Sequence, residues 1–501
     1  MTTIVATTLF SVLLISVGIY ANKFNTKTED GYFLGGRSIG TFATTMTLVF
    51  SIWSTLAFYG VIGESYNNGV GSLGIAQGIF WGSCLQVFIA YRLWTMGKMY
   101  GLSTPGDFFG ERFYSPFFKI VTSVGLIFFT MPYIGIQVAG LGIGLEGATG
   151  IPMRVGTIVF ASVLLLYVSI GGMRSVAWTD AVQGVVFTVV VLVALIVLIF
   201  SMPESLDSVM RQAMEARPGL TGYPGPNNVY SPMLMLHLTI TIGSFVVWPH
   251  IFIRYFIAKK KETYRTIAVA FPIYEVVCMV PLLIIGITII PYLFGGSLTR
   301  PEAEMSIQRA MLTLPYGTLL GSGIFLAAFS AAMSTASSQL LACSSMFMQD
   351  IFKRFVKTDM PEQKIVYYGR IAIAVFVVVS TTFGLLVPGI FNVVTRFATP
   401  GYAQLLPPLI AGLFWKRATR EGAIAGTLVG FTVLLLTSLV WPNPLRITAL
   451  LWSISANIIV LVIVTLITPK PPQEVIEKYH DAITNEMFKR SEEVQAEMNV
   501  S

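Results

Sequence analysis

The run VVFTVVVLVALIVLIF fills residues 185–200 without one charged side chain. A hydrocarbon core about 30 Å thick is crossed by about 20 apolar residues in a helix, or by about ten alternating residues in a β-strand. This run is continuous and does not alternate, so it excludes a β-barrel and predicts a transmembrane helix. We expect helices throughout, because every backbone polar group has to be satisfied within lipid.

The composition of the whole chain points to the same class. Of its 501 residues, 54% are hydrophobic and 11% are charged, against roughly 25% charged in an ordinary soluble domain. The mean hydropathy is +0.73. These values exclude soluble, disordered and fibrous proteins and predict an all-α polytopic membrane protein whose partner is the lipid bilayer. We attribute the net charge of +7 to basic loops, and we expect no nucleic-acid partner.

Further apolar stretches of similar length divide the chain into about 13 predicted transmembrane helices. The first of them precedes Lys23 and lacks a basic segment before it, so we expect a retained helix and not a cleaved signal peptide. The predicted spans lie near 4–20, 41–62, 73–94, 117–144, 153–170, 177–201, 231–257, 268–294, 316–347, 367–388, 394–414, 421–440 and 444–467.

Basic residues set the predicted orientation. With these spans, 25 of the 32 Lys and Arg residues fall on the side that holds the C-terminus, and 7 fall on the other side. Cytoplasmic loops carry the excess of Lys and Arg. We therefore expect a multi-pass protein of the cell (plasma or inner) membrane with its N-terminus outside and its C-terminus in the cytoplasm.

Helices 2–6 and 7–11 form two groups of five, and an odd-numbered unit repeated in tandem inserts with opposite orientation. This is the inverted-repeat logic of many secondary transporters. The predicted organisation is an extra N-terminal helix (1–30), a first repeat (31–202), an external loop of irregular structure (203–230), a second repeat (231–415), helices 12 and 13 (416–467) and a cytoplasmic tail (468–501).

Three spans hold an unusual density of polar or helix-breaking residues. Residues 44–55 contain six Ser and Thr, residues 242–256 contain Pro249, and residues 327–345 read AAFSAAMSTASSQLLACSS. Freed carbonyls and clustered hydroxyls could bind a hard monovalent cation. The alternatives are hydroxyls bonded back to their own helices and a packing face of small residues.

Intramembrane charge is costly, so two carboxylates stand out. Asp180 opens the sixth helix, where it is either functional or an acid in the first helical turn beside Arg174. Glu275 lies within the eighth helix, where it is either a proton site or, as we favour, a structural partner of a basic loop residue. Arg254 is expected at the cytoplasmic end of the seventh helix.

Five stretches resemble the sodium:solute symporter family, in the same order as in that family and between about residues 30 and 430. They are YFLGGRSIG (32–40), GGMRSVAWTDAVQG (171–184), PHIFIRYF (249–256), AAMSTASSQLLACSSMFMQDIFKRF (331–355) and FWKRATREGAIAGTLVG (414–430). The PHIFIRYF stretch is similar to the proline and pantothenate carriers. The resemblance implies a core of the LeuT type with a five-plus-five inverted repeat.

The resemblance also implies sodium sites. The family's shared site falls on the hydroxyls of Ser334 and Thr335 and on the carbonyls of Ala331, Phe50 and Trp53. A second sodium site of some members falls on Asp180, Ser334, Ser337 and Ser338. The substrate position of the family falls on Trp53, Thr55, Gln77, Thr241, Phe245 and Gln404.

We therefore expect a sodium-coupled symporter that imports a small polar solute by alternating access, with Na⁺ as the coupling ion. The solute would be an organic acid, a monocarboxylate or an amino acid. The alternative is a transporter of the same fold that is driven by protons or by no ion. The chain lacks a paired catalytic signature, so we expect no enzyme activity. A functional monomer is expected.

Overall fold

The computed structural model describes residues 1–26, 28–226, 229–356, 360–387 and 394–487. Within these ranges the chain is helical and forms no β-strand; an isolated bridge joins Ile39 to Ala258. Nine helices there are long and apolar enough to cross a membrane, or ten if the bent pair Pro232–Val247 and Pro249–Phe256 is one span. The all-helical prediction is confirmed, whereas the count of 13 stays a prediction, as do the domain boundaries.

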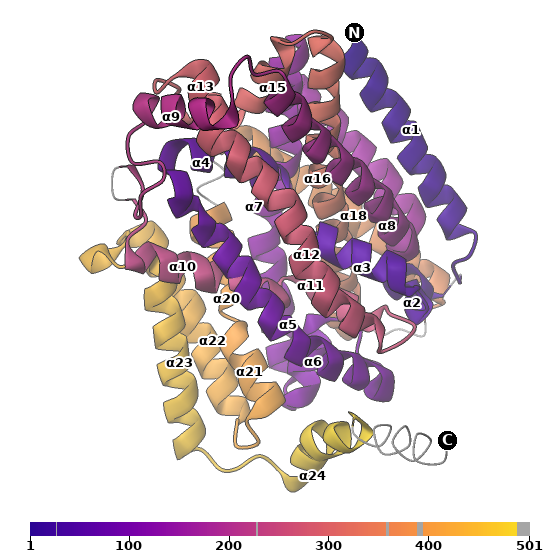
Figure 1. Ribbon diagram of the computed structural model, residues 1–501. Coiled ribbons are helices and arrows are strands. Elements are labelled where there is room, and N and C mark those ends of the chain that lie inside the picture. The colour runs from indigo at the N-terminus through magenta and orange to yellow at the C-terminus, as the bar shows by residue number, and fades with distance from the viewer. Residues whose placement is uncertain (27, 227–228, 357–359, 388–393, 488–501) are drawn as a thin grey trace, which may run out of the picture.

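Long helices make up the body of the molecule (Figure 1). They are nearly continuous apolar runs, as lipid requires. Their bounds are α1 Thr2–Asn22, α5 Leu73–Tyr100, α7 Pro116–Thr149, α8 Met153–Phe200, α12 Thr263–Ile284, α16 Gly317–Met346, α18 Glu362–Leu386, α22 Arg420–Leu435 and α23 Ala449–Ile467.

Helix α8 joins two predicted spans across a bend at Gly172. This residue has φ +61° and ψ −167°, values outside the helical region. A Cβ atom at this position would lie 2.5 Å from the carbonyl oxygen of Tyr32, which belongs to the short helix α2 (Glu29–Leu34). Glycine is needed here both for the positive φ and for the close approach of α2.

Two other spans are interrupted as the sequence predicts. The first consists of α3 (Thr41–Phe50) and α4 (Thr55–Asn68), and the Ser54 hydroxyl caps α4 by accepting from the amide of Ala57 at 3.1 Å. The second consists of α10 (Pro232–Gly243) and α11 (Pro249–Phe252), with a bend of 42° ahead of Pro249. Both interruptions lie in the interior of the molecule, since residues 51–54 and 244–248 are buried.

Helix α16 lies at the centre of the bundle and packs on α8, α7 and α1. From Phe325 to Met346 only Leu326 is partly exposed, because small side chains let the neighbouring helices approach closely. Helices α22 and α23 pack on each other at the side of the bundle (Figure 1).

Shorter helices connect or cap these elements. They are α6 Pro105–Arg112, α9 Leu206–Ala216, α13 Ile290–Phe294, α14 Arg300–Glu304, α15 Ser306–Leu312, α17 Lys353–Phe355, α20 Thr399–Ala403, α21 Leu406–Phe414 and α24 Gln473–Ile476. Irregular structure was expected throughout the predicted external loop (203–230), but this is wrong for its first half, where α9 forms. The Ser205 hydroxyl caps this helix by accepting from the amide of Ser208. Of the predicted tail, residues 488–501 lie outside the described residues.

Candidate functional site

The break between α3 and α4 turns carbonyl groups toward α16. The amide of Trp53 donates to the carbonyl of Phe50 at 3.0 Å, which closes a tight turn. The carbonyls of Trp53 and Ser51 accept from the Thr335 hydroxyl of α16, at 2.5 and 3.2 Å. The broken helix and the hydroxyl cluster are therefore in direct contact.

The other two predicted sodium-site residues of α16 are buried near Thr335 on the same helix. The Ser334 hydroxyl is buried and makes no hydrogen bond with the described residues. Ala331 is buried one turn earlier on the same helix. The set of Phe50, Trp53, Ala331, Ser334 and Thr335 offers only neutral oxygens, which fits a hard monovalent cation.

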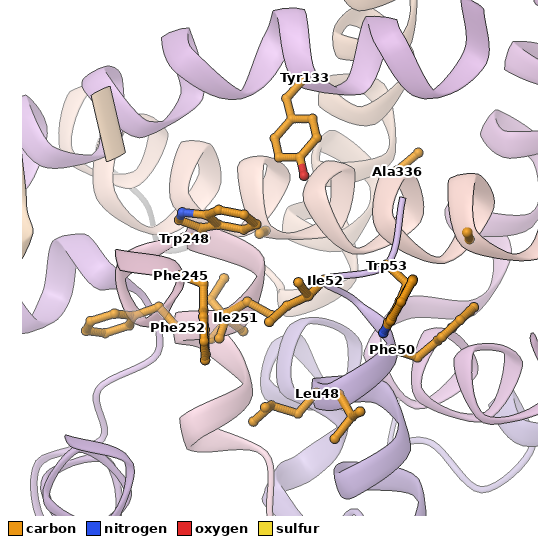
Figure 2. Close-up of a cluster of buried hydrophobic side chains, with 14 of the residues drawn as sticks. Leu48, Phe50, Ile52, Trp53, Tyr133, Phe245, Trp248, Ile251, Phe252 and Ala336 are labelled. Carbon is orange, nitrogen blue, oxygen red and sulfur yellow. The ribbon is translucent and has the colours of Figure 1, made fainter. Parts of the chain in front are cut away.

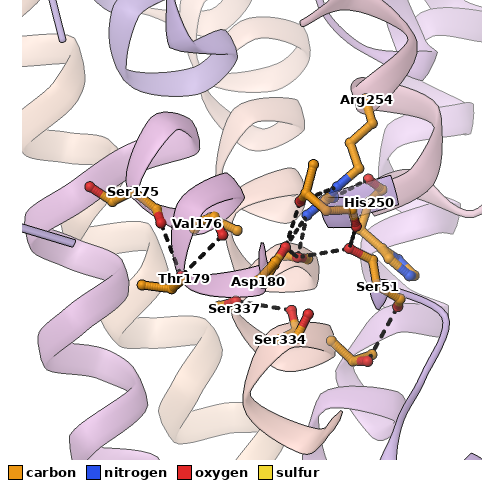
Figure 3. A network of polar contacts seen from close by, with 12 residues as sticks. Ser51, Ser175, Val176, Thr179, Asp180, His250, Arg254, Ser334 and Ser337 are labelled. Carbon is orange, nitrogen blue, oxygen red and sulfur yellow. Dashed lines mark hydrogen bonds and ion pairs between the residues drawn. The ribbon is translucent and has the colours of Figure 1, made fainter. Parts of the chain in front are cut away.

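A second polar cluster surrounds Asp180 (Figure 3). Its Oδ2 accepts from the Thr47 hydroxyl at 2.5 Å and lies 3.0 Å from Nη2 of Arg254. Ser338 contributes a hydroxyl 3.4 Å from Oδ2 and also receives a short hydrogen bond from Arg254. The fourth predicted member, Ser337, instead donates to the carbonyl of Ser334 at 2.9 Å.

The environment of Arg254 was not predicted from the sequence. Arg254 does lie in the last segment of its bent span, Ile253–Phe256, but its guanidinium is fully buried and bonded to Asp180, Thr47 and the carbonyl of His250. Asp180 likewise lies eight residues past the bend at Gly172, so it is not a helix-opening acid. A buried charge needs a partner, and the two residues supply each other.

A cavity of about 540 Å³ lies beside the break. This volume suits a small solute, since ligand pockets commonly measure roughly 300–1,000 Å³. Its inner wall contains Trp53, Tyr133 and Trp248 (Figure 2), together with Glu275 and Thr241. Aromatic and polar side chains thus meet in this part of the wall, and aliphatic residues such as Ile52, Ile79 and Leu234 line much of the rest.

The cavity extends to a polar cluster at the end of α4. Here Glu64 lies 3.1 Å from Arg300 and accepts from the Tyr230 hydroxyl at 2.8 Å. Burial and the Glu64 carboxylate raise the pKa of Tyr230, so it stays a neutral donor. Arg300 and Arg396, which also line this part of the cavity, are exposed.

Of the six predicted substrate-binding residues, two line the cavity and four do not. Trp53 and Thr241 line the cavity. Thr55 is buried and donates to Gln137 at 2.9 Å, while Phe245 stacks on Phe271. The remaining two, Gln77 and Gln404, are also outside the cavity wall: Gln77 is exposed on α5, and Gln404 bonds to Ser453 and Asn457.

Sequence reasoning missed the placement of Tyr133, Trp248 and Glu275 in the cavity wall. Glu275 was noticed as an intramembrane charge, but its expected basic partner is wrong: Oε1 accepts from the Trp53 indole at 3.1 Å. Two signals pointed to the others, since Trp248 precedes the helix-breaking Pro249 and Tyr133 follows Pro132 within α7.

Comparison with known proteins agrees with this architecture. The sequence model of the sodium:solute symporter family matches residues 32–430. A sodium/proline symporter of Haemophilus influenzae is 25% identical over 95% of this chain and 96% of its own. An osmoregulated proline transporter of Bacillus subtilis is 27% identical over 93% of this chain and 95% of its own.

Solved structures are similar over nearly the whole chain. A substrate-bound, outward-open Na⁺-coupled sialic acid symporter aligns with a TM-score of 0.81 and 17% identity, covering 94% of this chain and 99% of its own. The transporter MhsT, in complex with L-phenylalanine, aligns with a TM-score of 0.53 and 16% identity, covering 85% and 97%. These neighbours are transporters of the LeuT fold, and the prediction of that fold is confirmed.

Proposed function

Since the chain belongs to the sodium:solute symporter family, we propose that it couples the inward movement of Na⁺ to the import of a small polar solute across the cell membrane. Membership of the family makes the chain a transporter and not an enzyme. The observation that carries the proposal is the contact of the Thr335 hydroxyl with the Trp53 and Ser51 carbonyls. This contact joins neutral oxygen atoms of the α3–α4 break to a hydroxyl of α16, and these two parts of the molecule have to separate if the transporter changes state.

Sodium would be held by the hydroxyls of Ser334 and Thr335 and by the carbonyls of Phe50, Trp53 and Ala331. When bound, the ion supplies a charge that draws α3, α4 and α16 together. Trp53 contributes its carbonyl to this site and its indole to the cavity. Ordering of the α3–α4 break by Na⁺ would therefore raise the affinity for the solute, and bound solute would raise the affinity for Na⁺ by the same factor.

The energy for uptake comes from the ion gradient. Each Na⁺ that enters gains about 2.3 kcal/mol per 100 mV of membrane potential, in addition to its concentration term. A rocking motion of helix bundles would expose the site first to the outside and then to the cytoplasm. In the proposed orientation the N-terminus is outside and the polar cluster of Glu64, Arg300 and Tyr230 faces the exterior.

A second sodium at Asp180, Ser334, Ser337 and Ser338 would have to compete with Arg254. The guanidinium already compensates the carboxylate at 3.0 Å. A second ion would bind there only in a state in which Arg254 has moved away. We therefore propose that the site at Thr335 is the primary coupling site.

Uptake into proteoliposomes tests the proposal. Labelled amino acids, monocarboxylates, pantothenate and sugars are offered under an inward Na⁺ gradient, with K⁺ in place of Na⁺ as the control. We expect uptake of one solute class with Na⁺ only, and its loss in a variant carrying Ser334→Ala and Thr335→Ala. Uptake that does not depend on Na⁺ but is driven by a pH gradient would instead favour a proton-coupled transporter.

A further inference from the structure

The cavity wall contains a buried carboxylate whose charge the described residues do not compensate. The Glu275 side chain is 6% exposed and belongs to the cavity lining. Its Oε1 accepts from the Trp53 indole at 3.1 Å, whereas its Oε2 has no hydrogen-bond partner among the described residues. The indole is a neutral donor, so it orients the carboxylate without cancelling its charge.

The other charged groups of the lining are placed differently. Glu64 is already engaged by Arg300, Tyr230 and Asn68 at the far end of the cavity. Arg300 and Arg396 are exposed there. Glu275 is therefore the buried, uncompensated carboxylate on the described part of the wall, and a buried charge without a partner is costly.

The surfaces beside Glu275 favour a cationic ligand. Trp53, Trp248 and Tyr133 line the same cavity, and the ring planes of Trp and Tyr attract ammonium groups. A protonated or quaternary nitrogen would thus meet both a carboxylate oxygen and aromatic faces. A solute with a carboxylate as its sole polar group would meet the repulsion of Glu275 instead.

From this arrangement we propose that Glu275 binds a cationic nitrogen of the transported solute, so that the substrate is an amine or a zwitterion and not a simple monocarboxylate. The inference rests on the proposed symport function and narrows its substrate class. It also gives Trp53 a second role. Its carbonyl accepts from Thr335 in the proposed sodium site, and its indole holds the carboxylate that binds the solute.

Matched ligands of nearly the same shape test the inference on the full-length protein. We would measure thermal stabilisation of the purified protein in Na⁺ by L-proline, by cyclopentanecarboxylate, which lacks the nitrogen, and by pyrrolidine, which lacks the carboxylate. A wider panel pairs other amino acids and betaines with their nitrogen-free analogues. We expect stabilisation by at least one nitrogen-bearing compound and by none of the nitrogen-free partners.

Variants assign the effect to Glu275. E275Q should weaken binding of the stabilising compound roughly 10- to 100-fold, as expected for a lost charged hydrogen bond, whereas E275D should retain part of it. E215Q, which removes an exposed carboxylate outside the cavity, should bind like the wild type. Binding of ²²Na⁺ alone is measured on every variant. The amide oxygen of Gln can still accept from the Trp53 indole, so E275Q should leave Na⁺ binding within about twofold of the wild type.

Three results would overturn the inference: stabilisation by nitrogen-free carboxylates, unchanged binding of the amine in E275Q, or a protein that binds Na⁺ but responds to no nitrogen-bearing compound. These failures leave sodium binding intact. Failure of the proposed function itself is distinguishable, because the wild-type protein would then bind no ²²Na⁺.

Discussion

Replacing Arg254 and Asp180 together by leucine should destabilise the protein by less than the sum of the two single replacements. Both side chains are fully buried, and Nη2 lies 3.0 Å from Oδ2. Loss of one partner leaves an uncompensated charge in the interior, at a cost of about 3–5 kcal/mol. Loss of both removes that charge and leaves the neutral partners Thr47 and Ser338 with unmet hydrogen bonds.

A double-mutant cycle gives the magnitude. We expect R254L to lower the free energy of unfolding by about 3–5 kcal/mol, and D180L to have a cost of the same order. The double variant should recover a coupling energy of about 2–3 kcal/mol relative to the sum of the two. Unfolding by SDS in mixed micelles, followed by intrinsic fluorescence, measures these free energies.

The control cycle uses Arg211 and Asp207, an ion pair whose side chains are both more than two-thirds exposed. Its coupling should not exceed about 0.5 kcal/mol. The reasoning would be refuted if the costs of R254L and D180L simply added, so that the buried pair behaved like this exposed one.

Two further predictions concern the bend of α8 and the C-terminal segment. Gly172→Ala should lower the free energy of unfolding by about 1–3 kcal/mol, because φ is +61° and the new Cβ would meet the Tyr32 carbonyl. Gly101→Ala, with φ +71° but open space around the Cβ position, should cost less in the same SDS titration, and equal costs would contradict the account of the bend. Burial, followed by the nearby Arg112, lowers the pKa of His480 to about 4, so the docked segment binds fewer protons than the free one, whose histidine has a pKa of about 6.5. Docking is therefore strongest above about pH 6.5 and weakens as the pH falls toward 4. Hydrogen exchange of residues 473–487 should quicken over this range, and H480Q should abolish this pH dependence. Hydrogen exchange that stays constant with pH in the wild type would exclude this role of His480.

Much of the fold could be predicted from local sequence. Continuous apolar runs such as 185–200 predict helices regardless of their neighbours. The interruption before Pro249 follows from the missing amide of proline. The Ser and Thr residues of 327–345 predicted a polar site, and Thr335 does contact the broken helix.

The cavity could not be predicted from local sequence, because its wall comes from distant segments. Glu275 meets the Trp53 indole across 222 positions of the chain, and Arg254 meets Asp180 across 74. Neither partner is marked by spacing within one helix, so each charge was given a local role. Gln404 shows the converse. This polar residue of a predicted transmembrane span forms its hydrogen bonds with Ser453 and Asn457 of α23 and does not line the cavity.

Equilibrium binding of ²²Na⁺ to the purified protein is the most direct test of sodium coupling. The wild type and Thr335→Ser, which keeps the hydroxyl, should bind Na⁺ saturably, and K⁺ should not compete. The variant with Ser334→Ala and Thr335→Ala should lose at least about tenfold in affinity, since two of five oxygen ligands are removed. Binding by this double variant as tight as that of the wild type would contradict the assignment of the sodium site.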